Sequence, residues 1–196
     1  MKKIEKKRPP EFFQQFLKKR KPKAWNDIAE IRARMRAFIL DEEQRGQCAY
    51  TELTLSDSPD SSHIDHFKKQ SDRFFPKNRF DWNNLLVSTN NENYGAKWKD
   101  KTIRKKDYNK LVNPTNESPN EYLYFSATGH VEQKNDSPKG HFTIDTFNLN
   151  HPALIEQRKI VANTVSQMST QFSEDELVTL IGKFESTIRT IYKDIK

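Results

Sequence analysis

The clearest structural signal in this chain is an apolar stripe between Trp25 and Arg45. Its residues recur at the spacing of one helix face, and Gly46 follows as a typical helix end. They are Ile28, Ile31, Met35, Phe38 and Ile39. Because only 34% of all residues are hydrophobic and 31% are charged, few such stripes exist. We therefore expect helices packed around a modest, aromatic-rich core.

Periodicity and turn residues predict the remaining elements. Helices are predicted at 10–20, 93–106, 152–168 and 174–192. Strand-like segments are predicted at 48–55, 63–67, 122–126, 130–133 and 142–144, with a compact apolar element at 81–88. Ser173, followed by three acidic residues, is a typical start for the last helix. Residues 1–9 are interpreted as a basic tail.

The balance of charge and the cysteine count narrow the class of protein. A net charge of +7 favours polyanionic partners such as nucleic acid, through contacts to phosphate. The single cysteine, Cys48, excludes an intrachain disulfide framework. No apolar run approaches the roughly 20 residues that span a bilayer, and no signal-peptide core follows the basic N-terminus. We expect a cytoplasmic protein with no membrane partner.

Polar residues near the middle of the chain suit the hydrolysis of a phosphodiester. That reaction needs a base that activates water and a divalent cation that neutralises developing charge. Histidine is the natural base near neutral pH, and magnesium prefers oxygen ligands. The chain offers Asp65 and His66 on a predicted strand, then Asn84, then Asn93 near the start of a predicted helix. Adjacent strand residues point to opposite faces, so the site also needs a turn or bulge.

The order and spacing of these residues resemble the HNH endonuclease motif. The resemblance implies that His66 is the general base, and that Asp65 and Asn93 hold one divalent cation, Mg²⁺ or Mn²⁺. It implies that Asn84 holds the neighbouring loop and the His66 ring in place. His63 is a further candidate for the catalytic site, where it contacts substrate or metal, or only caps the strand.

Flanking segments extend the resemblance over most of the chain. The segments 48–51, 62–67, 81–86 and 143–158 look like those of PtuB-type HNH proteins. These proteins are nuclease subunits of Septu-like and some retron-linked anti-phage systems. The resemblance implies three partners: nucleic acid, a PtuA-like ATPase and, in retron-linked systems, a retron reverse transcriptase with its DNA–RNA product.

The chain departs from that family at a metal site. Many members carry two Cys-x-x-Cys pairs that bind a structural zinc. Here the first pair reads Cys48 and Thr51, and the second falls at Thr89 and Glu92. Closed structural zinc sites use four thiolate or imidazole ligands, so we expect no structural zinc. The side chains expected to hold this region instead are Tyr50, Leu85 and Tyr94.

A basic run follows Asn93. Its members assigned to nucleic-acid binding are Lys97, Lys99, Lys101, Arg104 and Lys105. We interpret them as contacts to phosphates beside the scissile bond. The alternative is a solvated helix face.

The predicted fold is α+β, a ββα-metal (HNH) core wrapped by N-terminal and C-terminal helices. Its parts are a basic tail and helices at 1–46, the core at 47–108, and a β-hairpin with helices at 109–196. The predicted function is that of a metal-dependent endonuclease in an anti-phage complex. Two alternatives stay open: a catalytically silent HNH-like adaptor that binds nucleic acid or the ATPase, and an unrelated basic RNA-binding module.

Overall fold

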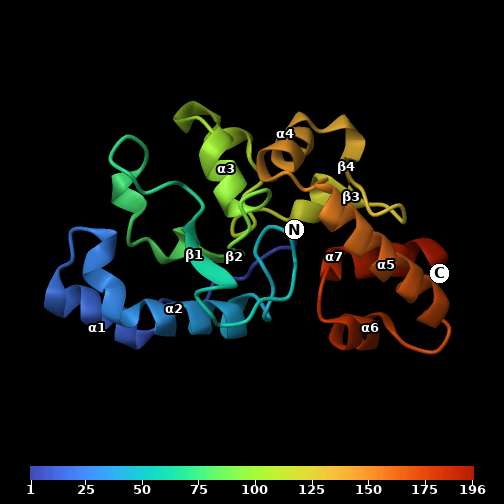
Figure 1. Cartoon of the computed structure of the whole chain (residues 1–196), viewed down its shortest axis with the longest axis horizontal. Helices are drawn as coiled ribbons and strands as arrows, with labels where there is room; N and C mark the ends of the chain where they lie inside the picture. Colours follow the sequence, from blue (N-terminus) through green and yellow to red (C-terminus); the bar gives the residue numbers. More distant parts are fainter.

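A computed structural model describes the whole chain from Met1 to Lys196. The helices are α1 (Glu11–Arg20), α2 (Arg32–Phe38), α3 (Ala96–Thr102), α4 (Pro138–Phe147), α5 (Pro152–Met168), α6 (Glu174–Ile181) and α7 (Glu185–Ile195). The strands are β1 (Ser62–His66), β2 (Leu85–Thr89), β3 (Leu123–Phe125) and β4 (Val131–Gln133). In Figure 1, α1 and α2 lie at one end and α5–α7 at the other, with β1, β2 and α3 between them.

The strands β1 and β2 pair antiparallel, and α3 follows them in the chain. Asp65 lies opposite Leu86, and His66 lies opposite Leu85. Since strand residues alternate between faces, the pair has two different sides. One side, with Leu85 and Val87, packs on the N-terminal helices, and the other, with Leu86, packs on the central core.

The apolar stripe from Ile28 to Ile39 is buried or half-buried, but not as one continuous helix. The segment runs as a 3-10 helix (Trp25–Ile31), then α2, then a π-helical turn (Ile39–Glu43). The break lies at Ile28, whose φ of −104° and ψ of 18° are not helical. Packing against β2 outweighs helical regularity here, since Ile28, Met35 and Ile39 are all fully buried.

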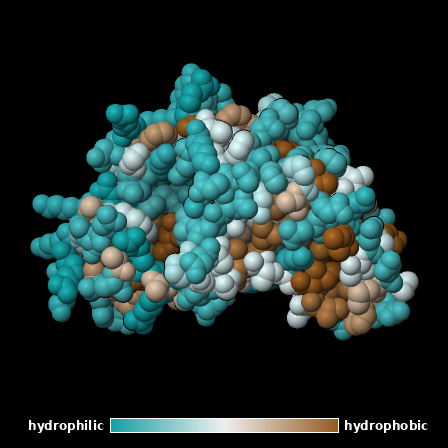
Figure 2. Space-filling view, in the orientation of Figure 1, coloured by the Kyte–Doolittle hydropathy of each residue, from teal (hydrophilic) through white to brown (hydrophobic).

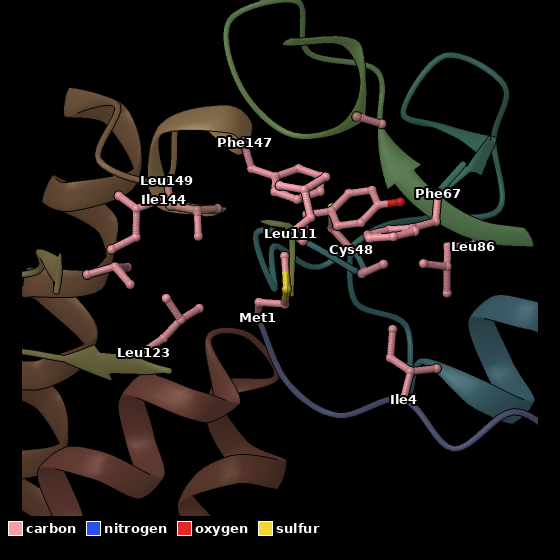
Figure 3. Close-up of a cluster of buried hydrophobic side chains, with 14 of the residues drawn as sticks. Met1, Ile4, Cys48, Phe67, Leu86, Leu111, Leu123, Ile144, Phe147 and Leu149 are labelled. Atoms are coloured by element: carbon pink, nitrogen blue, oxygen red, sulfur yellow. The ribbon is translucent and has the colours of Figure 1, made fainter. Parts of the chain in front are cut away.

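The central core brings the N-terminal residues Met1 and Ile4 together with residues up to Leu149, as Figure 3 shows. Met1 and Ile4 are buried beside Cys48, Phe67 and residues of α4. The interpretation of 1–9 as a basic tail is therefore wrong for this segment. Lysines lie around these two apolar residues, and three of them pair with carboxylates; Lys2, for example, lies 2.6 Å from Glu185.

The C-terminal part confirms some predictions and corrects others. The hairpin β3–β4 and helix α5 lie where the sequence predicts them. Residues 142–144 are helical, not a strand, because α4 begins at Pro138 with Ser137 as its cap. The predicted helix 174–192 is broken at Gly182, whose φ is +67°.

No helix of the structure has both the length and the apolar character needed to cross a membrane. Figure 2 shows a mostly hydrophilic face, with apolar surface gathered near α6. The large hydrophobic side chains that are exposed are Ile160, Leu180 and Ile195.

Candidate functional site

Asp65 projects from β1 toward α3 and is almost fully buried, with 5% exposure. Its carboxylate accepts hydrogen bonds from the Tyr50 hydroxyl and from the Lys99 ammonium group. The Lys99 nitrogen lies 2.9 Å from the Asp65 oxygen, and the Lys99 side chain is completely buried. The side chain assigned to a divalent cation is therefore already neutralised by an internal cation.

Lys99 also ties α3 to the end of β1. Its ammonium group donates to the carbonyl oxygens of His66 at 2.9 Å and Phe67 at 3.1 Å. Burial opposes the charge on Lys99, yet the carboxylates of Asp65 and Asp100 raise its pKa. Burial alone would raise the pKa of Asp65, but Lys99, His63 and Tyr50 outweigh it and hold that pKa below its ordinary value. Both side chains are therefore charged at neutral pH.

His66 points to the opposite side of the strand pair. Its Nε2 lies 3.0 Å from the carbonyl oxygen of Arg79. A carbonyl can only accept, so Nε2 carries the proton and Nδ1 keeps a free lone pair. Nδ1 makes no hydrogen bond within the protein and is not fully buried, so it retains contact with solvent. Trp25 packs edge-on against the imidazole, with ring centroids 4.4 Å apart.

Burial also sets the protonation state of this imidazole. It lowers the pKa of His66 below its ordinary value, and the Arg79 carbonyl offsets only part of that effect. A neutral imidazole with one free nitrogen is the form that a general base requires.

Asn84 fastens the long loop between β1 and β2. Its side-chain oxygen accepts from the Lys68 backbone N–H at 2.7 Å. Its amide group donates to the carbonyl oxygens of Lys68 at 3.0 Å and Asn78 at 3.1 Å. Because Arg79 follows Asn78 directly, this clamp fixes the segment whose carbonyl orients His66.

His63 lies two residues before Asp65 and so on the same side of β1. Its Nδ1 is buried without a hydrogen-bond partner. Burial lowers the pKa of His63, against the attraction of Asp65. The structure therefore places His63 near Asp65, on the side of the strand pair away from His66.

Asn93 does not join the other candidates. The predicted helix start at Asn93 is wrong, because α3 begins at Ala96 after Gly95, whose φ is +77°. Asn93 is exposed, its N–H donates to the Asn91 side chain at 2.8 Å, and its carbonyl accepts from Asn148 at 2.8 Å. The glycine and the local asparagine turn replace the first helical turn that the sequence predicted.

The residues present do not fit the predicted divalent site in this arrangement. Asp65 holds the Lys99 ammonium group, and Asn93 lies exposed with other partners. No three histidine, cysteine, aspartate or glutamate side chains are grouped so as to hold a metal. A divalent ion on Asp65 would have to displace Lys99 and leave its charge buried and unpaired, which is costly.

The basic run divides into paired and unpaired side chains. Lys97 and Lys101 both lie 2.8 Å from Glu92, and Arg104 pairs with Asp107. Hydrogen bonds from Lys101 and Lys97 lower the pKa of Glu92 to about 2. The assignment of Lys99 to phosphate binding needs correction, because that side chain is buried in the ion pair with Asp65. Lys105 is exposed and has no carboxylate partner.

The sequence analysis missed the roles of Lys99 and Arg79, and the hydrogen bond from Tyr50 to Asp65. A signal existed for the first of these: Lys99 shares a helix face with Ala96 and Ile103, at spacings of three and four residues. Those neighbours are buried, so the lysine between them is buried as well. The carbonyl of Arg79 leaves no signal in the sequence, because a backbone group acts through the path of the loop.

Short polar and aromatic side chains fill the region where the resemblance places two cysteine pairs. Cys48 is buried, with its sulfur 3.5 Å from the Ser88 hydroxyl. That hydroxyl also accepts from the Ala96 backbone N–H at 3.4 Å. Tyr50 stacks on Phe147 with ring centroids 4.3 Å apart. Hydrogen bonds and aromatic packing therefore join the strand pair to α3 and α4.

Comparison with known proteins places the chain near one curated protein. It is 32% identical over 111 residues to a protein named Septu protein PtuB from Bacillus mycoides (strain KBAB4). This similarity supports a Septu PtuB-like relationship. The match covers 50% of this chain and 37% of the relative, so the chain spans little more than a third of that protein. No model of a protein family matches the chain.

Proposed function

We propose that this chain hydrolyses phosphodiester bonds of nucleic acid in a Septu-type anti-phage defence system, with His66 as the general base. The observation that carries the proposal is the state of His66. Its Nε2 proton is held by the Arg79 carbonyl, its pKa is lowered by burial, and its Nδ1 is free. That nitrogen can take a proton from water as the water attacks phosphorus; the P–O bond to the leaving oxygen breaks, and that oxygen takes a proton from solvent.

In this proposal, other residues hold the His66 ring in position. Asn84 holds the loop that carries Arg79, and Trp25 fixes the plane of the ring. A general base contributes typically about 10²–10⁴-fold to a rate, and much of that depends on correct placement. The basic surface expected from the net charge of +7 supports a polyanionic substrate.

The biological setting of the proposal rests on resemblance. The relative's name places it in the Septu system. For this chain we propose a PtuA-like ATPase as partner, with a retron reverse transcriptase and its DNA–RNA product as a further candidate. Cleavage assays should therefore include the products of neighbouring genes.

A specific observation favours the second candidate function, a catalytically silent adaptor. Asp65 is engaged by Lys99 and not open to a cation. An adaptor would bind nucleic acid or the ATPase and cut nothing.

The experiment that separates the two compares wild-type protein and His66→Ala, each with its co-purified partners, on single-stranded DNA, duplex DNA and RNA. Reactions run with Mg²⁺, with Mn²⁺ and with chelator. Cleavage by the wild type that the variant loses supports the base. Absence of cleavage by both, with intact binding to the partners, supports the adaptor.

A further inference from the structure

A basic, aromatic pocket of about 350 Å³ opens beside the loop that follows β1. The loop contributes Phe67, Lys68 and Phe75, and the 3-10 helix Lys105–Lys110 contributes Lys105 and Tyr108 among others. Sites for small ligands occupy about 300–1,000 Å³, so the volume suits one nucleotide-sized group. Phe67 directly follows His66 in the chain, but its ring packs in the central core on the α3 side, away from the His66 ring.

The aromatic wall of this pocket is fixed in place. Phe75 meets Tyr108 edge to face, with ring centroids 5.1 Å apart, and Tyr108 meets Phe67 in the same way at 6.4 Å. The Tyr108 oxygen also accepts from the Lys69 backbone N–H at 3.3 Å. Phe75 remains half-buried, so part of its ring faces the pocket. A held aromatic ring is a platform on which any nucleobase can stack.

Unpaired cations surround that ring. The ammonium groups of Lys68 and Lys105 lie 5.7 Å and 5.6 Å from the centre of the Phe75 ring. Neither forms an ion pair, whereas Lys97 and Lys101 of α3 and Arg104 after it do. The one carboxylate that lines the pocket, Glu117, is already paired with Lys139 at 2.5 Å. The pocket is therefore positive, and its free charge is concentrated next to its aromatic wall.

We propose that this pocket binds an unpaired nucleotide of a nucleic-acid strand, with the base on Phe75 and flanking phosphates on Lys68 and Lys105. The inference rests on the proposed function for its ligand class and names the form of that substrate. In a duplex the bases are stacked on one another, so their faces are closed to a side chain. Single-stranded or locally unpaired nucleic acid is the substrate that this pocket selects.

The test measures binding of a fluorescent single-stranded oligonucleotide by anisotropy, in a His66→Ala background that removes the proposed base. The pocket variants are Phe75→Leu and the pair Lys68→Gln/Lys105→Gln. The matched control is Lys159→Gln/Lys193→Gln, which removes the same charge from exposed lysines of α5 and α7. A duplex of the same sequence and a free mononucleotide serve as competitors, and thermal unfolding confirms that every variant is folded.

We expect Phe75→Leu to weaken single-strand binding by about fivefold or more, the lower end of the stacking effect. The lysine pair should reduce the slope of log affinity against log salt by about 1.4, since each phosphate contact to a single strand contributes about 0.7. The control pair should leave the affinity within about twofold, and the duplex should compete poorly.

If the pocket variants and the control bind the single strand with equal affinity and equal salt dependence, the pocket is not the binding site and the proposal is wrong. If the free mononucleotide binds and the oligonucleotide does not, the ligand of the pocket is not a nucleotide within a strand, and the proposal is wrong. The proposed function fails separately: wild-type protein that binds through the pocket and cuts nothing removes hydrolysis and keeps the pocket. If the pocket variants bind and cleave nucleic acid as well as the wild type, the pocket proposal fails and the hydrolysis proposal stands.

Discussion

The ammonium group of Lys99 lies 2.9 Å from a carboxylate oxygen of Asp65, and the lysine side chain is completely buried. This ion pair connects α3 to β1 at the centre of the candidate site. It also leaves the Asp65 carboxylate engaged by protein groups on the side where the HNH resemblance implies a metal. Both consequences can be measured.

Replacing Lys99 by methionine should destabilise the fold strongly. The substitution keeps the length of the side chain but leaves Asp65 as a buried, unpaired charge, which typically costs about 3–5 kcal/mol. Urea unfolding at neutral pH measures the free energy of unfolding. The control is Lys101→Met on the same helix, whose partner Glu92 is exposed. Losses of similar size in the two variants would show that the buried pair adds nothing.

Removing the Asn84 clamp should lower cleavage more than it lowers stability. Asn84→Ala frees the loop that carries Arg79 and leaves backbone groups of Lys68 and Asn78 without partners, at about 1–3 kcal/mol. The exposed neighbour Asn83→Ala is the control. Unfolding midpoints and cleavage rates are compared below the midpoint of each variant. An Asn84→Ala protein that cuts at the wild-type rate would be incompatible with the clamp.

Stability should fall as the pH drops below about 6.5, the ordinary value for histidine. Burial lowers the folded-state pKa of both His63 and His66. Below about pH 6.5 the unfolded chain therefore binds more protons than the folded one, and this stability is lost as pH falls through the folded pKa values. The free energy of unfolding, measured from about pH 7.5 to about pH 5, gives the slope of stability against pH. The variant His63→Gln/His66→Gln should flatten it, with His141→Gln as the control; an unchanged slope would show that other groups dominate.

Manganese should not bind tightly at Asp65 in the arrangement described. A divalent ion would have to displace the buried Lys99 ammonium group and leave its charge unpaired. Electron paramagnetic resonance of the wild-type protein with sub-stoichiometric Mn²⁺ should show the signal of the free ion. A bound signal that saturates at one ion per chain, together with a higher unfolding midpoint, would mean that Lys99 leaves the site.

The sequence predicted the elements whose signals are local. Helix α5 starts at Pro152, and the capping pair of Ser173 and Glu176 starts α6, as residue preferences indicate. It also predicted that Asp65 and His66 would point apart, because alternation along a strand is local geometry. These predictions depend on neighbouring residues alone.

Predictions that depend on distant contacts were less accurate. The helix from Trp25 was expected to be continuous, yet packing against β2 bends it at Ile28. The basic run predicts phosphate contacts for Lys99; its spacing to Ala96 and Ile103 signals burial, but only the tertiary structure identifies Asp65 as its partner. Asn93 was misplaced because Gly95 delays the helix. The partner of His66 is a backbone carbonyl, which no residue type reveals.

Chemical rescue of His66→Ala tests the central claim most directly. The small variant leaves a space beside Trp25 and the Arg79 carbonyl into which free imidazole fits. The cleavage rate of a nucleic-acid substrate is measured for the wild type and for the variant, with and without imidazole. If His66 is the general base, the variant should lose about 10²–10⁴-fold in rate, and imidazole should restore part of it in proportion to its neutral form. A variant that cuts as fast as the wild type, and does not respond to imidazole, would contradict the account.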